Sequence, residues 1–408
     1  MDNETLFLYY CNAFSEEIRS ISLTLNKGFE LSFLGQMFPL EIVQFINILY
    51  VKCKIEEFDS IKISCGLTYS LIYRNGLLYR CGSINDNHSL TKFEFTGIKK
   101  IDSIVSSNIK VPNTYGINMY AMYQKKDKLY SLFDDHKDKS NVISINPLQI
   151  KSGPQNTLIL AKNDRLFGCG NNDYGQLGLG INVMGLYCYS FSKIDIPNVI
   201  SFECGYYHTF VLTKEGLFGC GSNLDYQLGL DERETYSILT KLDINNVLSF
   251  ACGTFHSLIL TKEGLFFCGS FYNKSNNERS INVEYESSTR SKWVNCQYEK
   301  NFMKLPISNI ISFSCGEEYS LILTRDGLYE LDRSTTSKIF IHGQYLSVEV
   351  QNLRKLDLMK TVLNFSCGVN HAIVLTKEGL FGRGDNEKGQ LGLGDQIHNR
   401  VEFKRIVF

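Results

Sequence analysis

This sequence has almost no net charge, a single tryptophan and no long apolar run. Its 42 Lys and Arg residues nearly balance 43 Asp and Glu residues, which leaves a formal net charge of −1. A phosphate-neutralising surface usually leaves a basic excess, so the composition does not favour DNA or chromatin as a partner. The most apolar stretch, residues 38–51, contains Glu41, Gln44 and Asn47. It is also shorter than the roughly 20 residues that a membrane-spanning helix needs, so we expect no membrane contact.

The N-terminus and the cysteines give an expectation of compartment. The chain begins MDNE, which is acidic where a secretory signal would be basic. Its 13 cysteines are an odd number in a chain of 408 residues, unlike the paired cysteines of small secreted scaffolds. We therefore expect a cytoplasmic or nuclear protein that is not secreted.

What the chain does have is an internal repeat. Residues 200–221 read ISFECGYYHTFVLTKEGLFGCG, and residues 248–269 read LSFACGTFHSLILTKEGLFFCG. Further copies occupy residues 61–82, 151–170, 311–331 and 363–384, and a faint one occupies residues 116–132. The first glycines of the seven copies are Gly66, Gly116, Gly153, Gly205, Gly253, Gly316 and Gly368. Their spacing runs from 37 residues (116 to 153) to 63 residues (253 to 316).

Each copy predicts four short strands. Residues 208–213 (HTFVLT) and 217–221 (LFGCG) flank a Lys-Glu-Gly turn, which is typical of a β-hairpin. Residues 193–196 (KIDI) and 199–202 (VISF) add an outer strand and the next inner strand. Repeated four-stranded units bury their faces against one another when they are arranged radially. The sequence therefore predicts an all-β fold, a seven-bladed β-propeller of four-stranded antiparallel blades.

The repeat resembles the regulator of chromosome condensation repeat. The resemblance rests on CG-x-x-H-[ST]-x-x-L-T-x-x-G-L-[FY]-x-x-G followed by N-x-x-x-Q-L-G-L. The loop that carries the second part matches that of the family fully at residues 171–180 (NNDYGQLGLG) and 385–394 (DNEKGQLGLG) and in part at 223–230 (NLDYQLGL). The resemblance covers about residues 58–408 and implies a seven-bladed propeller. A WD-type propeller is disfavoured because Trp293 is the only tryptophan.

Residues 1–57 lie outside the repeats, and we expect them to form a separate segment that closes the ring or packs on it as a helix. Residues 6–10 (LFLYY) are a candidate strand for the last blade. Residues 39–50 (PLEIVQFINILY) have helical periodicity and are similar to the first helix of an F-box, an adaptor that binds a ubiquitin-ligase scaffold.

The repeated cysteines and histidines suggest zinc ligands, but the repeats favour a structural role. Equivalent copies carry Tyr69, Asn156 or Tyr319 in place of the histidine, and copies on different blades do not converge. We expect the histidines to bond backbone groups and to join blades. The structural residues of the repeat are Cys65, Gly66, Cys204, Gly205, His208, Cys252, Gly253, His256, Cys315, Gly316, Cys367, Gly368 and His371. We expect no catalytic residue, cofactor or metal, because no nucleophile or carboxylate recurs beside them and no phosphate-binding signature is present.

Candidate partner contacts lie where a unit departs from the repeat. The longest departure, residues 270–304, contains Arg279, Arg290, Lys292 and Trp293. Long loops on a rigid scaffold commonly bind partners, and Trp and Arg are enriched in binding hot spots. A structureless insertion with Trp293 against the ring is the alternative, and a second departure at residues 127–140 is expected to be a solvated loop.

These observations favour a non-catalytic interaction scaffold that presents propeller loops to another protein. Two alternatives stay open. The resemblance implies guanine-nucleotide exchange on a Ran-like small GTPase, although no exchange residue can be placed by motif. The F-box-like segment suggests a substrate adaptor of a ubiquitin ligase.

Overall fold

A computed structural model of the chain describes residues 61–407 with internal gaps. The gaps are residues 75–76, 83–90, 94–102, 111–117, 126–127, 134–140, 144, 271–283, 288–289, 294–301, 318, 342–343, 357, 359–360 and 395–398. The propeller occupies the second of two compact units, Ile63–Phe408. Residues 1–60 lie outside the described residues, as do the expected strand at 6–10 and the expected helix at 39–50. The boundary at residue 57 therefore stays a prediction.

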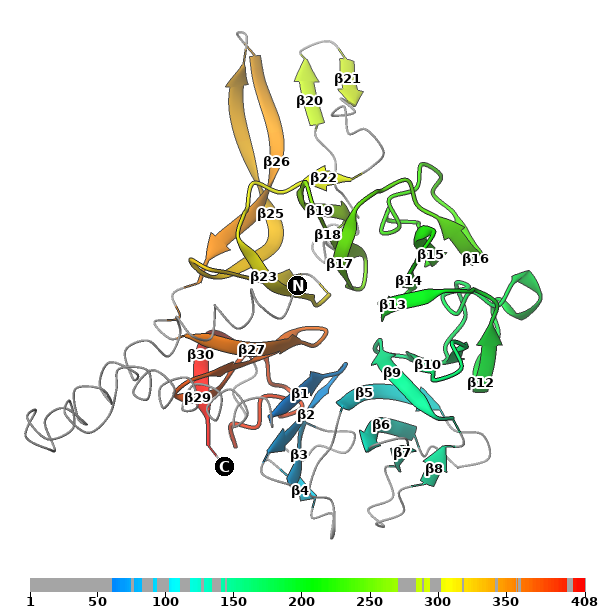
Figure 1. The fold of residues 1–408 in the computed structure, drawn as a ribbon. Helices are drawn as coiled ribbons and strands as arrows, with labels where there is room; N and C mark the ends of the chain where they lie inside the picture. The colour runs from blue at the N-terminus through cyan, green and yellow to red at the C-terminus, as the bar shows by residue number, and fades with distance from the viewer. Residues whose placement is uncertain are drawn as a thin grey trace, which may run out of the picture. The chain divides into compact units, whose positions relative to one another are not determined.

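Seven antiparallel sheets stand around a central axis, and each is one blade (Figure 1). Blade 1 is β1 (Lys62–Cys65), β2 (Tyr69–Arg74), β3 (Leu77–Gly82) and β4 (Thr91–Phe93). Blade 2 is β5 (Ser103–Lys110), β6 (Asn118–Lys125), β7 (Lys128–Phe133) and β8 (Asn141–Ile143). Blade 3 is β9 (Pro147–Ser152), β10 (Asn156–Ala161), β11 (Leu166–Gly170) and β12 (Cys188–Ile194). Blade 4 is β13 (Val199–Cys204), β14 (His208–Thr213), β15 (Gly216–Ser222) and β16 (Thr235–Lys241).

The other three blades depart further from one another. Blade 5 is β17 (Val247–Cys252), β18 (His256–Thr261), β19 (Gly264–Gly269) and β22 (Met303–Lys304). Blade 6 is β23 (Ile310–Cys315), β24 (Tyr319–Thr324), β25 (Gly327–Ile341) and β26 (Gln344–Lys355), joined by β20 (Glu284–Ser287) and β21 (Arg290–Trp293). Blade 7 is β27 (Val362–Cys367), β28 (His371–Thr376), β29 (Gly379–Asp385) and β30 (Asn399–Ile406). The predicted seven-bladed fold is confirmed.

The second strand of a blade is buried because blades pack on both of its faces. In β28 (HAIVLT) all six residues are buried, and β14 (HTFVLT) has one partly exposed residue. The turn after β14 is closed by Thr213, whose Oγ1 accepts from the N–H of Glu215 at 3.1 Å and donates to the carbonyl of Gly216 at 3.3 Å. Gly216 has φ 130°, a conformation that favours glycine.

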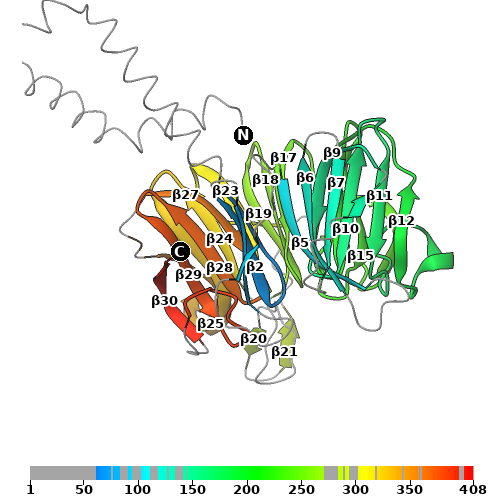
Figure 2. The ribbon, with the colours of Figure 1, turned by 90° about the horizontal axis from the view of Figure 1, so that it is seen from below.

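The hydrophobic core lies between blades. Leu158 of blade 3 clusters with Phe202 and Val211 of blade 4, and Phe210 of blade 4 clusters with Ile259 of blade 5. Seen edge-on in Figure 2, the strands run between the two faces of the ring. No helix among the described residues is long and apolar enough to cross a membrane; the one short 3-10 turn is η1 (Ile181–Val183).

Blade 7 takes all four strands from one continuous stretch, β27 to β30. The outer position is held by β30. The blade is thus four-stranded without residues 6–10, which lie outside the described residues.

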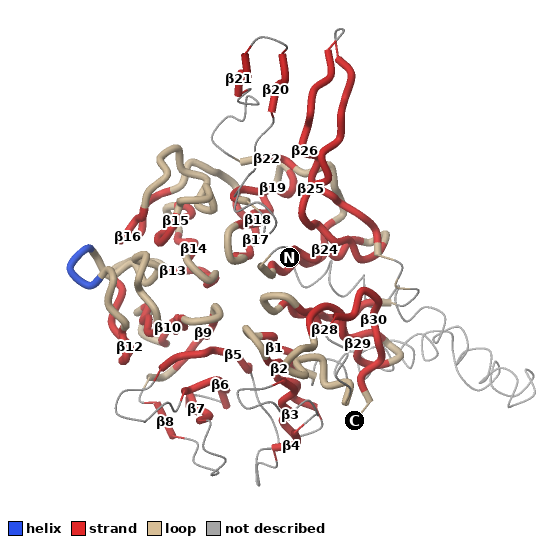
Figure 3. Tube along the Cα trace, turned by 180° about the vertical axis from the view of Figure 1, so that it is seen from behind, coloured by secondary structure: helices blue, strands red, loops and turns tan. Residues whose placement is uncertain are grey.

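Blades 5 and 6 share a feature that projects from the rim of the ring, which we call the platform (Figure 3). It consists of residues 284–287 and 290–293, inserted between β19 and β22, with residues 333–341 and 344–351 of β25 and β26. The strand order β21-β20-β26-β25-β24-β23 makes it continuous with blade 6. In this part the backbone is described and the side chains are not.

Candidate functional site

Three histidines join neighbouring blades through serine hydroxyls. The pairs, with their Nε2 to Oγ distances, are His208–Ser257 (2.7 Å), His256–Ser320 (2.6 Å) and His371–Ser70 (2.7 Å). They connect blade 4 to 5, blade 5 to 6 and blade 7 to 1. The histidines do join blades, but the expectation of a backbone partner is wrong for Nε2, which contacts a hydroxyl.

The hydrogen bond of Ser257 fixes the proton on His208. Ser257 Oγ donates to the carbonyl oxygen of Gln227 at 2.8 Å, so the ring must donate from Nε2 to Ser257. Burial lowers the pKa of His208 to about 3, because a charged ring loses its water there. The imidazole is therefore neutral near pH 7 and acts as a hydrogen-bond donor.

The N-x-x-x-Q-L-G-L loops form a second connection between blades. In each loop a buried asparagine accepts from a leucine N–H five residues later: Asn172 from Leu177 (2.9 Å), Asn223 from Leu228 (2.9 Å) and Asn386 from Leu391 (3.1 Å). The main-chain carbonyl of the loop glutamine then accepts a hydrogen bond from a thiol of the next blade: Gln176 from Cys220 (3.5 Å), Gln227 from Cys268 (3.4 Å) and Gln390 from Cys81 (3.2 Å). These loops are interblade connectors.

The cysteines before the first glycine hydrogen-bond along the inner strands. Their thiols donate to a carbonyl of the preceding blade: Cys204 to Lys151 (3.7 Å), Cys252 to Glu203 (3.7 Å), Cys315 to Ala251 (3.6 Å) and Cys367 to Ser314 (3.5 Å). Burial raises the pKa of Cys65 to about 11 and that of Cys315 to about 12. These thiols stay protonated near pH 7, which disfavours nucleophilic or metal-binding roles.

The arrangement around His208 does not gather metal ligands. The thiol of Cys204 is directed at blade 3, whereas the ring of His208 is directed at blade 5. Among the described residues, no group of three or more His, Cys, Asp or Glu side chains could hold a metal ion.

The first glycines meet near the axis of the ring. A Cβ on the glycine of one blade would collide with the glycine carbonyl oxygen of the next: Gly153 with Gly205 (2.2 Å), Gly205 with Gly253 (2.5 Å), Gly253 with Gly316 (2.7 Å), Gly316 with Gly368 (2.8 Å) and Gly368 with Gly66 (2.6 Å). The spacing of adjacent blades therefore requires the absence of a side chain at these positions.

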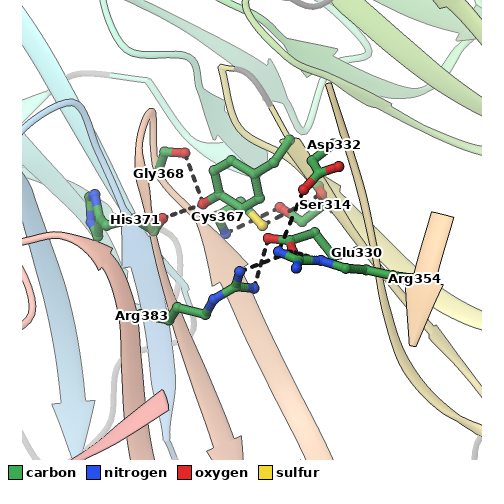
Figure 4. Close-up of polar contacts among 9 residues, drawn as sticks. Ser314, Glu330, Asp332, Arg354, Cys367, Gly368, His371 and Arg383 are labelled. Atoms are coloured by element: carbon green, nitrogen blue, oxygen red, sulfur yellow. Dashed lines mark hydrogen bonds and ion pairs between the residues drawn. The ribbon is translucent and has the colours of Figure 1, made fainter. Parts of the chain in front are cut away.

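The junction of blades 6 and 7 adds charged side chains to the glycine and cysteine contacts that it shares with other junctions (Figure 4). Glu330 accepts two bonds from Arg383 of blade 7, Nη1 to Oε1 at 2.7 Å and Nη2 to Oε2 at 3.0 Å. Arg354 of β26 donates to the same carboxylate from the other side, at 2.9 Å from Nε and 2.5 Å from Nη2. The Glu330 side chain is only 7% exposed, so little water reaches its carboxylate. The two guanidinium groups compensate the negative charge of this carboxylate in place of water.

Tyr319 takes the histidine position in blade 6. Its hydroxyl lies 2.5 Å from the carbonyl oxygen of His371 and 3.3 Å from that of Gly368, both in blade 7. In this blade the partner is therefore a backbone group, unlike the hydroxyl partners of the three histidines. The residue at the histidine position therefore makes a polar contact across each of four junctions, those between blades 4 and 5, 5 and 6, 6 and 7, and 7 and 1.

The platform begins where a glycine is missing. The third strands of blades 1, 3, 4, 5 and 7 reach a glycine with φ between 93° and 110°: Gly82, Gly170, Gly221, Gly269 and Gly384. A Cβ at any of them would lie 2.3 to 2.4 Å from a backbone oxygen. Blade 6 has Asp332 at this position, and β25 continues in extended conformation to Ile341.

The sequence carried a signal for the platform that the repeat count missed. Blades 3, 4 and 7 have a glycine where blade 6 has Glu330: Gly168, Gly219 and Gly382. A Cβ there would lie 3.0 to 3.2 Å from the buried leucine of the blade's own Q-L-G-L loop. Blades 5 and 6 lack that loop and carry Phe267 and Glu330 instead. A large residue at this position thus accompanies the absence of the loop.

Of the candidate partner contacts, Arg290, Lys292 and Trp293 lie on β21, at the edge of the platform. Their side chains, and Arg279 altogether, lie outside the described residues. The backbone register pairs Glu284 with Trp293 of β21 on one side and with Ser347 of β26 on the other. The insertion therefore contains a hairpin, and its partner role stays a prediction.

Comparison with known proteins identifies the repeat. Residues 163–212 match the family described as "Regulator of chromosome condensation (RCC1) repeat", and residues 148–176, 199–227 and 362–390 match a second family of the same description. The chain belongs to the regulator of chromosome condensation repeat family.

Two curated relatives of this family match over similar lengths. The mouse X-linked retinitis pigmentosa GTPase regulator is 30% identical over 264 residues, which cover 64% of this chain and 25% of that protein. The human probable E3 ubiquitin-protein ligase HERC6 is 28% identical over 267 residues, which cover 62% of this chain and 26% of that protein. The chain thus spans about a quarter of the length of these relatives.

Solved structures share the fold. The crystal structure of human WBSCR16 has a TM-score of 0.55 at 20% identity and covers 79% of this chain and 85% of its own. Prp20p from Saccharomyces cerevisiae, reported with its binding properties to Gsp1p and histones, has a TM-score of 0.55 at 16% identity and covers 76% and 81%.

Proposed function

We propose that this protein is a non-catalytic interaction scaffold whose platform binds a partner protein. The observation that carries the proposal is the pairing Glu284↔Ser347, which joins an insertion of blade 5 to the extended hairpin of blade 6. Two separate departures from the repeat thus form one sheet that projects from the ring.

The platform offers strand edges to a partner. Residues 333–341 of β25 pair with β26 on one side, and within the described part of the chain no strand pairs with their other side. β21 is the last strand at the opposite edge. Unpaired edges expose N–H and C=O groups that an extended segment of another protein can bind.

The sequence of the platform adds side chains suited to an interface. The hairpin contains the aliphatic residues Ile339, Leu346 and Val348, and its backbone register pairs the aromatic residues Phe340 and Tyr345. Aromatic residues are enriched at binding hot spots. The root of the hairpin is held by the contacts of Glu330 with Arg354 and Arg383, which favours a pre-organised surface.

A trimmed variant tests the proposal. Asp332 and Asn352 are opposite residues, so a two-residue Asn-Gly turn between them removes the distal hairpin and leaves the blade intact. Affinity purification of the tagged chain from its native cells, with quantitative mass spectrometry, should show one or more proteins lost from the trimmed variant. The control is Ile200→Ser, an exposed residue of β13 in blade 4. Identical partner sets for the trimmed variant and the control would refute the platform as the binding surface.

Guanine-nucleotide exchange is a second candidate, supported by the relative named as a GTPase regulator and by the study of Prp20p with Gsp1p. The test is release of a fluorescent GDP analogue from a Ran-type GTPase on mixing with this chain. Release that depends on chain concentration would support exchange, whereas release at the intrinsic rate would refute it.

The role of ubiquitin-ligase adaptor depends on residues 1–57 and stays a prediction. Its test is co-purification of a ubiquitin-ligase scaffold with the full chain and with a variant that lacks residues 1–57.

A further inference from the structure

Blade 3 contains the longest charge-free stretch around a Q-L-G-L loop. Residues 174–192 (YGQLGLGINVMGLYCYSFS) hold no Asp, Glu, Lys, Arg or His. The equivalent loop in blade 4 continues instead into Asp231, Glu232, Arg233 and Glu234. The stretch departs from the chain's own pattern, and neither the family fold nor the platform requires it.

The charge-free stretch is ordered against the outer strand of the next blade. Gly180 N–H donates to the carbonyl of Ser237 in β16 at 2.9 Å. The Thr235 hydroxyl contacts the sulfur of Met184 at 3.8 Å. The N–H of Gly185 donates to the carbonyl of Asn172, two residues before the stretch, at 2.9 Å. The loop therefore follows the edge of β16 and has a fixed position on blade 4.

Large apolar side chains of this loop and of β16 face solvent. Ile181 is 66% exposed, Leu186 57% and Tyr189 53%, and Ile238 on β16 is 61% exposed. Ile181 and Ile238 directly follow Gly180 and Ser237, the two residues joined by the hydrogen bond, so they lie close together. We call Ile181, Leu186, Tyr189 and Ile238 the rim patch. Exposed apolar side chains that lie near one another mark interaction sites.

Acidic residues border the rim patch. Glu234 directly precedes Thr235, which contacts Met184, and Glu232 and Glu234 are both exposed. Carboxylates of this segment also raise the pKa of Tyr236 beyond the effect of its burial, so their charges converge on β16. Arg233, the one cation among them, donates to the carbonyl of Leu224 at 2.9 Å. The border is therefore negative.

We propose that the rim patch binds an amphipathic segment of a partner protein that carries apolar side chains flanked by lysine or arginine. The apolar residues supply burial, and the acidic border selects the charge. An anionic membrane is disfavoured because its surface would repel the same carboxylates. A second copy is disfavoured because a symmetric contact would bring two acidic borders together. The rim patch lies on blades 3 and 4, so it is separate from the platform of blades 5 and 6.

Fluorescence anisotropy with defined peptides tests the proposal on the full chain. The probes are a fluorescein-labelled helical peptide of leucine and lysine with leucines at every third and fourth position, and its counterpart with glutamate in place of lysine. We expect the lysine peptide to bind more tightly, with an affinity that falls as salt rises. The double variant Ile181→Ser, Ile238→Ser should weaken its binding about tenfold, because two apolar contacts are lost. Glu232→Gln with Glu234→Gln should reduce the salt dependence.

The matched control is Ile200→Ser with Leu248→Ser, two residues of similar exposure at the start of β13 and β17. It should bind as the unaltered chain does, and so should the variant with the trimmed platform, which separates this site from the proposed function. Equal binding of both peptides, or equal loss in the matched control, would overturn the proposal. Co-sedimentation with phosphatidylcholine–phosphatidylserine vesicles, or self-association abolished by the Ile181 and Ile238 substitutions, would also overturn it.

Discussion

His371 and Ser70 are 301 positions apart in the chain, and Nε2 of the histidine lies 2.7 Å from Oγ of the serine. The pair connects blade 7 to blade 1, beside the 3.2 Å contact of the Cys81 thiol with the carbonyl of Gln390. The closing junction of the ring therefore uses the same groups as the junction between blades 4 and 5. The chain closes its ring among the described residues by repeating an internal contact.

The His371–Ser70 hydrogen bond should contribute measurably to stability. We expect His371→Ala and Ser70→Ala each to lower the free energy of unfolding by about 1 to 3 kcal/mol, because each leaves a buried polar partner unsatisfied. The double variant should lose less than the sum, since the hydrogen bond between the two side chains is lost only once. Urea denaturation of the four proteins gives the coupling energy. Strict additivity would show that the two groups do not interact in solution.

Stability should fall in mildly acidic solution. The pKa of His208, His256 and His371 is lowered to about 3 by burial, whereas an unfolded histidine titrates near 6.5. The unfolded chain therefore binds more protons between these values, so stability is full above pH 6.5 and decreases as the pH falls towards 3. Each histidine should cost roughly 2 kcal/mol at pH 5. Unfolding free energies at pH 7.5, 6 and 5 measure the slope.

The matched variant for this slope is His208→Asn, since blade 3 has Asn156 in that position. The variant should be less stable at neutral pH but should show a shallower decrease on acidification. A slope unchanged by the substitution would mean that His208 is not buried as a neutral ring.

The charge cluster of blades 6 and 7 should be sensitive to loss of one partner. Glu330→Ala leaves Arg383, whose side chain is 14% exposed, without its carboxylate, and should lower the free energy of unfolding by about 3 to 5 kcal/mol. The pair Glu330→Leu, Arg383→Leu should be less destabilising than Glu330→Ala, because no buried charge remains. Thermal and urea unfolding compare them. A single variant as stable as the unaltered chain would contradict the assignment.

The described thiols should differ sharply in reactivity. Cys81, Cys220 and Cys268 are buried, and burial raises the pKa of each, whereas Cys188 is partly exposed. Brief treatment with iodoacetamide at pH 7.5 should modify Cys188 first and leave the other three unmodified until urea unfolds the chain. Peptide mass spectrometry reports each site. Early modification of Cys220 or Cys268 would show that the interblade contacts of these thiols do not persist.

The sequence was sufficient to predict the architecture because each blade repeats the same local interactions. Gly205 and Gly253 mark an approach that only glycine allows, and the threonine-closed turn before Gly216 fixes the hairpin, so spacing alone revealed the ring. The partner of a histidine was harder to predict. Ser257 occupies the position after a histidine in its own blade, and only the interblade geometry shows that it meets His208.

The platform was not predicted because its signal is a substitution and not a motif. The interval from Gly316 to Gly368 is 52 residues, the same as from Gly153 to Gly205, so the length of the unit conceals the change. The replacement of the turn-forming glycine by Asp332 lets β25 continue. The pairing of Glu284 with Ser347 joins two different repeat units, which no pattern within one repeat contains.

Photo-crosslinking from the platform tests the scaffold function most directly. A benzoylphenylalanine in place of Phe340, on the distal hairpin, is compared with one in place of Ile200 on blade 4 in cells that produce the tagged chain. The account predicts a discrete crosslinked protein from position 340 that is absent from position 200 and that is also lost from the trimmed variant in affinity purification. Crosslinks confined to position 200, or none from position 340, would contradict it.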